Sequence, residues 1–580
     1  MRDDARIDLE DLWLGSRVGV RIPLANPRAE FGEDRLERVH CFETTSHAHP
    51  AAAALMEPEE RVATGEDGTL REETGHFRGS TLLVFGKFIG LILDLSTQIL
   101  IVRALSRTEF GAFAFGLSVA SLAATVALLG LDKTISRFVP LYEEHGDDRR
   151  LTGSLVLAFG VVAGVCAAML LALIGFQAQF GDEIVENELA RQLMLILFLL
   201  APVRAFDSLA TACFAIFGSA RSIVLRRNVL APGLQLIVVA VVILADQPAE
   251  VLAIGYVVAG MIGIAAFAVA LARLLRQKGI AGRIVRRDFR IPARAIFGFS
   301  LPLLSSDVVF LLRTSAVIVL LQYLATSNEV AAYGAVLPLA RQNLVIYQSF
   351  GFLFVPVAAR LFARGEHDRL RNMYWQTSAW IAVATFPALA LTVALAGPLT
   401  VLLFGQAYAD AGAVLAVLAV GHYVNAALGF NALTLRVQGS VRFIVAVDVL
   451  SAVVSVVSSV LLIRAYGALG AGIATALTLV VQNLLYQAGL VRSAIGLPTP
   501  RLIVMFATIA AAIAALILVQ TATQMPLPLG VALAAAVSVG LVRISRGSLQ
   551  IGRYFPELLK VPFLRQLIGR PDVEVERRVI

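Results

Sequence analysis

Residues 218–224 read Gly-Ser-Ala-Arg-Ser-Ile-Val, and residues 439–445 read Gly-Ser-Val-Arg-Phe-Ile-Val. The two stretches are near copies at a spacing of about 220 residues. An internal repeat of this length predicts two related halves, which in a membrane protein is the architecture typical of a transporter. Other positions echo each other at nearly the same spacing: Glu109 and Glu329, Phe113 and Tyr333, Leu141 and Leu361, Asp148 and Asp368, Arg149 and Arg369.

Long apolar segments fill the chain after residue 80. The chain is 58% hydrophobic and 16% charged, with a mean hydropathy of +0.78, and a spanning helix needs roughly 20 apolar residues. About 14 such segments can be placed, and none alternates like the strands of a membrane β-barrel. We therefore expect an all-α polytopic membrane protein. The predicted spans are 81–105, 110–131, 152–176, 190–217, 222–245, 251–272, 295–322, 330–357, 374–398, 411–435, 443–464, 468–491, 502–520 and 527–544.

The repeat and the apolar segments together predict the organisation of the chain. Each half forms a lobe of six helices, so the last two spans are additional. Residues 1–80 have too few aliphatic clusters to offset the entropy of ordering, which predicts a mostly disordered tail. The expected regions are an acidic cytoplasmic tail (1–80), the first lobe (81–272), a basic cytoplasmic linker (273–294), the second lobe (295–491), spans 13 and 14 (502–544), and a basic cytoplasmic tail (545–580) with an interfacial helix over 554–570.

The basic residues orient the chain in the membrane. With the amino terminus inside, the even-numbered loops hold about 23 Lys and Arg and the odd-numbered loops about 4. Cytoplasmic loops carry this excess, so both termini are predicted to be cytoplasmic, in the cytoplasmic (inner) membrane. The formal net charge of +7 is then explained by contact with anionic lipid, and no nucleic-acid partner is implied.

The sequence favours a carrier over an enzyme. It lacks a Gly-rich phosphate loop, a His-Glu-x-x-His motif and a nucleophile elbow. The predicted outward loops are short, at about 5 to 15 residues, whereas a membrane glycan polymerase or ligase, a less favoured alternative, needs room for catalytic residues. Cys41, Cys166 and Cys213 are too scattered for a disulfide framework or a metal cage. We expect no metal and no cofactor.

Charged residues within the predicted spans are the candidates for function, because a charge near the bilayer centre costs roughly 2.5 kcal/mol or more. Arg313 and Arg341 have no acid a turn away on their own helix. They favour a water-filled cavity that accepts an anion, since guanidinium groups bind phosphate through paired hydrogen bonds. The other candidates are Lys87 and Asp94 in span 1, Arg204 and Asp207 in span 4, Asp307 in span 7, His422 in span 10 and Asp448 in span 11.

Several of these residues allow two interpretations. Arg204 and Asp207 are three residues apart, so Arg204 either pairs with Asp207 or contacts the substrate. His422 is either a proton-linked switch or a packing residue. Asp94 and Asp307 are candidates for binding a coupling ion, together with His422. Asp448 lies near the inner end of its span, where we expect it to be solvated.

Three further stretches resemble a known family. They are Arg103-Ala-Leu-Ser-Arg-Thr-Glu109-Phe110-Gly111-Ala-Phe113, then Leu403-Phe404-Gly405-Gln-Ala-Tyr408 with Leu435-Arg-Val-Gln-Gly439, and Tyr466-Gly467-Ala-Leu-Gly470-Ala471-Gly472-Ile-Ala474-Thr475-Ala476. As a set they resemble the polysaccharide (O-antigen type) flippases of the multidrug/oligosaccharidyl-lipid/polysaccharide (MOP) exporter superfamily. The resemblance covers residues 80–495 approximately.

The resemblance implies two six-helix lobes around a MATE-like V-shaped cavity and export of a polyprenyl-pyrophosphate-linked oligosaccharide by alternating access. It implies that cations meet the pyrophosphate, which here are Lys87, Arg313 and Arg341, with Arg204 as a further substrate-binding candidate. The implied partners are the lipid-linked oligosaccharide, membrane lipids and other glycan-assembly membrane proteins. Two alternatives stay open within the superfamily: a cation-coupled multidrug exporter, and a lipid II flippase, of whose several first-span cations the chain has only Lys87.

Overall fold

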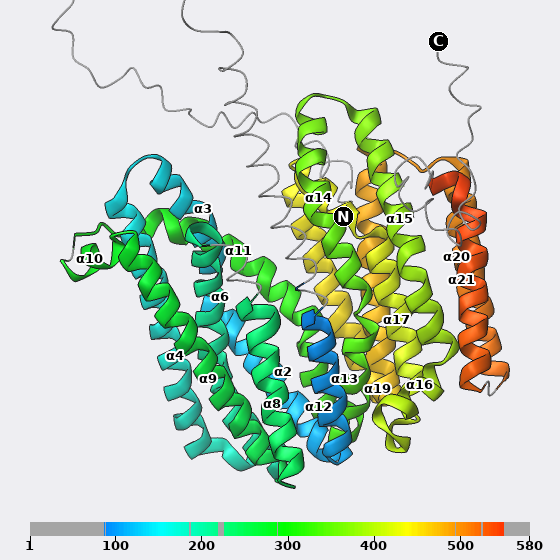
Figure 1. The fold of residues 1–580 in the computed structure, drawn as a ribbon, viewed down its shortest axis with the longest axis horizontal. Coiled ribbons are helices and arrows are strands. Elements are labelled where there is room, and N and C mark those ends of the chain that lie inside the picture. Colours follow the sequence, from blue (N-terminus) through cyan, green and yellow to red (C-terminus); the bar gives the residue numbers. More distant parts are fainter. Residues whose placement is uncertain are drawn as a thin grey trace, which may run out of the picture. The chain divides into compact units, whose positions relative to one another are not determined.

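The computed structural model describes residues 86, 89–184, 187–218, 225–286, 288–493, 495–523 and 526–549. All regular elements of these residues are helices, which confirms the predicted all-α class (Figure 1). The acidic tail, Lys87 and the predicted interfacial helix at 554–570 lie outside the described residues.

The first half of the described chain begins with a helix over residues 89–104. There follow α2 (Arg107–Leu128), α3 (Leu131–Glu144), α4 (Asp148–Ile184), α5 (Glu188–Phe198), α6 (Leu200–Phe217), the π-helix η2 (Leu225–Leu230), α8 (Ala231–Leu244), α9 (Ala249–Gln277) and α10 (Ile280–Val285).

The second half has the same all-helical character. It comprises α11 (Ala293–Thr314), α12 (Ala316–Leu324), α13 (Ser327–Ala340), α14 (Asn343–Ala363), α15 (His367–Ala394), α16 (Ala396–Phe404), the 3-10 turn η3 (Gln406–Tyr408), α17 (Ala411–Leu428), α18 (Phe430–Val437), α19 (Val441–Val491), α20 (Pro500–Ala522) and α21 (Leu527–Leu549).

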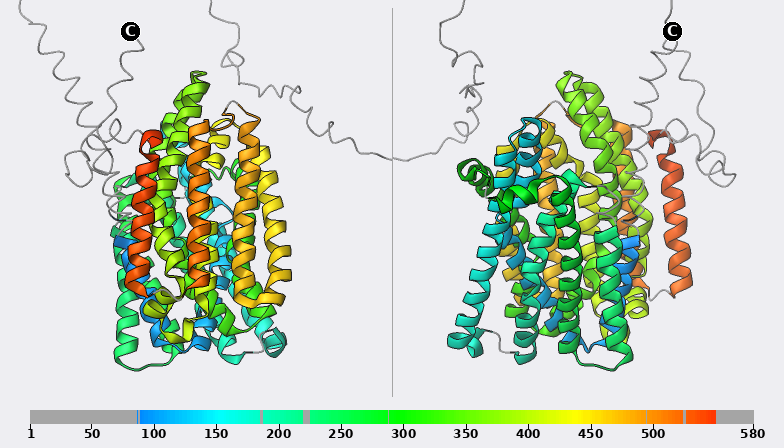
Figure 2. Two further views of the ribbon diagram at one scale, coloured as in Figure 1. Left: turned by 90° about the vertical axis from the view of Figure 1, so that its right-hand side faces the viewer. Right: turned by 60° about the vertical axis from the view of Figure 1, so that its left-hand side comes forward.

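Ten helical stretches among the described residues are long and apolar enough to cross a membrane. One of them, α19, contains predicted spans 11 and 12 joined at Gly467, whose backbone leaves the helical region. Predicted spans 7 and 8 are divided into shorter helices at Ser315 and at Arg341. The chain is therefore a multi-pass membrane protein, and the helices agree with the predicted 14 crossings. Figure 2 shows the long helices running side by side in both views.

The hydrophobic cores show how the two lobes meet. One core lies mainly in the first lobe, around Leu155 and Leu209, with Ile296 of α11 added, and another lies within the second lobe, around Phe386 and Phe430. A third core contains residues of both lobes, including α2, α9, α13 and α17. We call the end of the bundle with this common core the shared end. The end that carries α10 is called the linker end.

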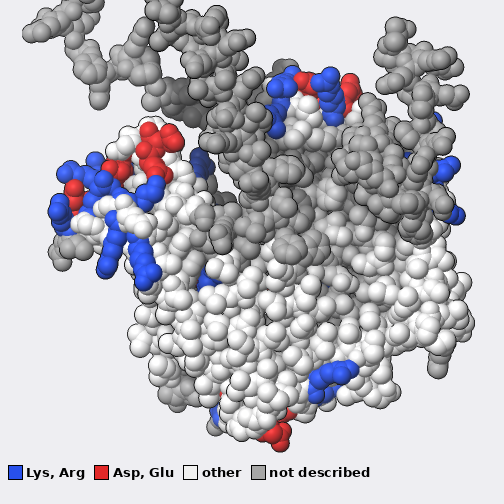
Figure 3. All heavy atoms as spheres, in the orientation of Figure 1, with Lys and Arg blue, Asp and Glu red and all other residues white. Residues whose placement is uncertain are grey.

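At the linker end, α11 joins the lobes, since it packs against α3 and α4 of the first lobe and α19 of the second. Figure 3 shows positive side chains over α10, and a largely uncharged surface between the charged ends of the visible face. Such a surface is what a bilayer requires of the helices that face it.

Candidate functional site

A break in the helical run after α2 directs charged residues toward the interior of the first lobe. Leu129 and Gly130 have positive φ angles of 49° and 70°, and helix α3 then begins at Leu131. A leucine in this conformation costs about 1–3 kcal/mol, so the surrounding structure must stabilise the break. Its consequence is that Asp132 and Lys133 line a cavity.

Helix α6 forms the opposite wall of this cavity. Arg204, Asp207 and Thr211 recur at helical spacing and all line it. Arg204 donates from Nη1 to Ser121 Oγ and, at 3.4 Å, to the backbone oxygen of Leu117. The guanidinium is therefore held against α2.

The third wall is the π-helix η2, a type of helix that often marks functional positions. It carries Arg226, which is 8% exposed, and Arg227, which is exposed. The Arg226 guanidinium pairs with Asp207 at 2.9 Å and lies 5.6 Å from the centre of the Phe267 ring. Gly263 leaves room for it, because a Cβ there would lie 2.9 Å from Arg226 Nη2.

The resulting cavity has a volume of about 710 Å³, within the range of small-ligand sites. Four cations and two carboxylates line it, so positive charge is in excess. Arg226 Nε is buried and has no hydrogen-bond partner among the described residues. An unsatisfied buried donor is costly, and an anion would satisfy it. The cavity can therefore hold an anionic group. Its charged lining residues are Asp132, Lys133, Arg204, Asp207, Arg226 and Arg227.

Comparison with known proteins relates part of the chain to a family. Residues 77–362 match the family model described as polysaccharide biosynthesis protein. These residues belong to that family. The resemblance predicted from the sequence is thus confirmed. Comparison with the sequences of curated proteins gives no match.

Solved structures share the fold of this chain at low sequence identity. The lipid II flippase MurJ, in an inward closed conformation, has a TM-score of 0.58 and 13% identity, covering 81% of this chain and 100% of that one. An inward-facing multidrug resistance MATE family transporter of the MOP superfamily has a TM-score of 0.55 and 16% identity, covering 71% and 98%. The outward-facing form of such a transporter gives 0.50 and 17%, covering 71% and 95%. The chain has the fold of these transporters.

The structure brings three of the candidate residues predicted from the sequence to the cavity. Arg204 and Asp207 line it, and Asp307 on α11 forms an ion pair with the lining residue Lys133. The alternative that Arg204 pairs with Asp207 is wrong, because Asp207 pairs with Arg226 instead. Asp207 thus pairs with a residue of another helix and not with its neighbour on α6.

The remaining predicted residues lie elsewhere. Asp94 is exposed on the helix over 89–104, and His422 is buried in α17. Arg341, at the end of α13, is half-buried and has no hydrogen bond or ion pair with a described residue. Arg313 belongs to α11, but its side chain, like Lys87, lies outside the described residues.

Asp448 is half-buried in α19 and has protein partners in addition to any contact with solvent. Its Oδ1 accepts hydrogen bonds from Gln482 Nε2 at 2.7 Å and Tyr486 Oη at 2.6 Å. Helix α19 folds back at Gly467, and this brings its second half beside Asp448. The second lobe thus holds the carboxylate in a hydrogen-bonded cluster.

Sequence reasoning missed Asp132, Lys133, Arg226 and Arg227. The predicted second span ended at residue 131, so Asp132 and Lys133 counted as loop residues. Arg226 and Arg227 lie inside the predicted fifth span, 222–245, but were not among the candidates. In the structure, residues 107–144 form one nearly continuous helical stretch, so Asp132 and Lys133 lie within it and not in a loop. Charges inside such a stretch call for a polar environment.

Proposed function

We propose that the protein moves a lipid-linked oligosaccharide with a pyrophosphate head group across the cytoplasmic membrane by alternating access of its two lobes. The observation that carries this proposal is the cavity in the first lobe, where Arg226 is buried beside three other cations. A sugar-pyrophosphate head is too costly to desolvate in hydrocarbon. A wet, cationic cavity inside a transporter fold lowers that cost.

The polarity proposed for the chain follows from its basic residues. The linker end carries α10 and its neighbouring arginines, and cytoplasmic loops are the basic ones. We place the linker end and both termini in the cytoplasm, and the shared end outside. The domain boundaries predicted from the sequence are part of the same proposal.

The cavity residues have separate roles in the proposed cycle. Arg226, Arg227 and Arg204 contact the pyrophosphate, and Asp207 is the counter-ion that the pyrophosphate displaces. Lys133 is neutralised by Asp307 until the lobes move. Lys87, Arg313 and Arg341 remain predicted contacts to the head group, while Asp94, Asp307 and His422 remain predicted sites for a coupling ion.

The test is translocation of a fluorescent polyprenyl-pyrophosphate oligosaccharide in proteoliposomes. We expect protein-dependent movement by the wild type and a roughly tenfold to hundredfold loss for Arg226→Gln, the size of a lost charge-assisted hydrogen bond. Arg226→Lys keeps the charge and should retain part of the activity. Arg369→Gln is the matched control, because Arg369 forms an exposed pair with Glu366 outside the cavity, and it should transport normally. The double variant Arg313→Ala/Arg341→Ala tests the residues predicted from the sequence.

Three results would contradict the proposal. Equal transport by Arg226→Gln and Arg369→Gln would remove the cavity from the mechanism. No movement of any glycan under proton or sodium gradients, together with export of cationic dyes, would favour the multidrug exporter, for which Asp132 and Asp207 in the cavity provide carboxylates. Formation of glycosidic bonds in the same vesicles would indicate a polymerase or ligase.

A further inference from the structure

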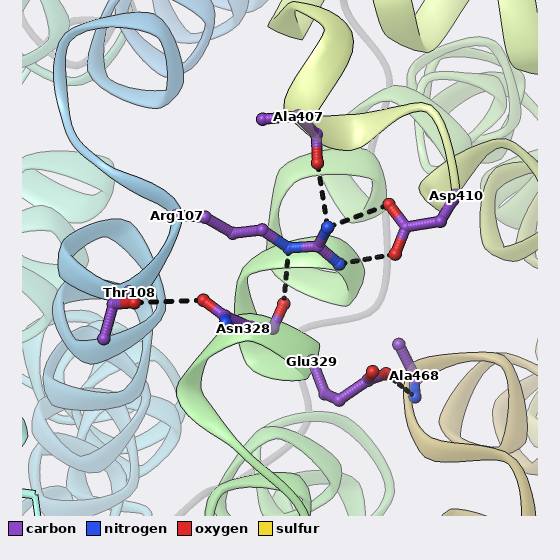
Figure 4. A network of polar contacts seen from close by, with 7 residues as sticks. All are labelled: Arg107, Thr108, Asn328, Glu329, Ala407, Asp410 and Ala468. Atoms are coloured by element: carbon purple, nitrogen blue, oxygen red, sulfur yellow. Dashed lines mark hydrogen bonds and ion pairs between the residues drawn. The ribbon is translucent and has the colours of Figure 1, made fainter.

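Arg107 joins the two lobes at the shared end through four hydrogen bonds (Figure 4). Its Nη1 and Nη2 donate to the two carboxylate oxygens of Asp410 at 3.0 and 2.6 Å. Nη1 also donates to the backbone oxygen of Ala407 at 2.8 Å, and Nε to that of Asn328 at 3.1 Å. Arg107 belongs to the first lobe and all its acceptors to the second. Paired bonds of this kind fix orientation as well as distance.

Neither charged partner is explained by the stability of its own helix. Arg107 is the first residue of α2, where the positive end of the helix dipole disfavours a cation. Asp410 is the N-cap residue of α17, yet its side chain makes no capping hydrogen bond. An aspartate in that position normally accepts from the helix backbone. Both residues are therefore committed to the contact between the lobes.

A second arginine reinforces the contact. Arg103 Nε donates to the backbone oxygen of Leu403 at 2.8 Å, and its Nη2 donates to that of Leu402. These two carbonyls belong to the last turn of α16, where backbone acceptors lack partners within the helix. An arginine of the first lobe thus caps a helix of the second.

The internal repeat places this contact on the axis that relates the lobes. Thr108 Oγ1 donates to Asn328 Oδ1 at 3.0 Å, and these residues are equivalents at the repeat spacing of about 220. By the same spacing, the Arg107–Ala407 bond corresponds to one between Ser327 and Asn187. That bond exists, at 3.2 Å, but joins neutral side chains. The repeat therefore supplies a symmetric pair of contacts, and only one has become ionic.

The ionic contact is accessible to water. The side chain of Arg107 is 21% exposed and that of Asp410 57% exposed. When the lobes separate, water can solvate both charges. The cost of removing that water when the pair forms again is small, because the pair stays partly exposed. A contact of this kind can form and break in each cycle.

We propose that Arg107 and Asp410 form a latch that keeps the two lobes together at the shared end, and that its release opens this end of the cavity. The idea rests on the proposed alternating access of the lobes. It concerns a conformational equilibrium, however, which can be measured without any substrate.

The experiment measures distances between spin labels on the two lobes. Labels are attached at Gln247→Cys and Ala409→Cys, two exposed positions that flank the shared core, in a chain whose Cys41, Cys166 and Cys213 are replaced by alanine. We expect a predominantly short distance with Arg107 intact and at least a doubling of the long-distance population in Arg107→Gln. Arg107→Asp combined with Asp410→Arg should restore the short distance. Arg369→Gln, which removes an ion pair of 2.7 Å within one lobe, should leave the distances unchanged.

The outcomes separate the latch from the proposed substrate. A shift in Arg107→Gln that the reversed pair restores supports the latch, even if no lipid-linked oligosaccharide is moved. An unchanged distance distribution in Arg107→Gln overturns the latch, even if the flippase is active. Widening that the reversed pair fails to restore also overturns it, because the ion pair is then not what holds the lobes.

Discussion

Replacing Gly111 by alanine should force the lobes apart at the shared end. A Cβ at Gly111 would lie 1.8 Å from the backbone oxygen of Ser327, whereas normal C···O contacts are about 3.3 Å or longer. The obstacle is backbone of α13, so no rotamer change can relieve it, and the two helix starts must separate by roughly 1.5 Å. Overpacking of this kind costs about 1–3 kcal/mol.

That cost falls on the state in which the shared end is closed. Since 1.4 kcal/mol is a factor of ten, Gly111→Ala should reduce the closed-to-open ratio by roughly 5-fold to 150-fold. The spin-label pair at residues 247 and 409 measures this ratio directly. Gly160→Ala is the control, because a Cβ there meets nothing within 4 Å. It should be neutral or stabilising by up to about 1 kcal/mol.

If Gly111→Ala and Gly160→Ala give the same distance distribution and the same thermal midpoint, α2 and α13 are not in close contact in the membrane. A lower midpoint without a change in the distance distribution would also refute the prediction, because the strain would then be relieved inside one lobe.

Three other perturbations test neighbouring parts of the argument. Asp207→Asn leaves Arg226 buried without its counter-ion and should lower the free energy of unfolding by about 1–3 kcal/mol. Added inorganic pyrophosphate should raise the thermal midpoint of this variant more than that of the wild type. An equal rise in both proteins would contradict the role of Asp207 as counter-ion. Gly263→Ala places a Cβ 2.9 Å from Arg226 Nη2. It should therefore weaken several-fold the thermal stabilisation of the protein by pyrophosphate. An unchanged dependence of the thermal midpoint on pyrophosphate concentration would contradict this. Gly467→Ala brings a Cβ within 2.5 Å of Glu329 Oε2 and should lower the thermal midpoint. The decrease should be clearly smaller in a Glu329→Ala background, because the obstructing carboxylate is gone. If the decreases caused by the two substitutions simply add in the double variant, the contact is contradicted.

Hydropathy predicted the helices of this chain because a bilayer imposes one requirement on every spanning segment. It was less reliable where a helix faces protein or water instead of lipid. Predicted span 2 ended at residue 131, yet the helical stretch continues to Glu144. Lys133 interrupts the apolar pattern, and the structure accommodates it with Asp307 from another helix. Sequence-local hydropathy contains no information about that partner.

The candidate site was predicted in part for the same reason. A cation in the membrane indicates a polar surrounding, and Arg204 was found in this way. Which acid pairs with which base is decided by helix packing. Asp207 could meet Arg204 along its own helix, but the Arg226 that reaches it comes from η2, after the break between α6 and α8. Only the fold of the first lobe brings these residues together.

Two of the stretches that carry the family resemblance contact each other, and the third contacts Glu329 on α13, which separates their role from that of the cavity. Arg103 and Arg107 of the first bond to the backbone of Leu403 and Ala407 in the second, and Ala468 in the third donates to Glu329 at 2.5 Å (Figure 4). None of these residues lines the cavity described in the first lobe. A sequence signature shared across a family of transporters would then reflect the closure of the lobes more than the choice of substrate. We therefore expect Arg103→Gln to change the spin-label distances while leaving the stabilisation by pyrophosphate intact. Loss of that stabilisation with unchanged distances would assign the signature to substrate binding.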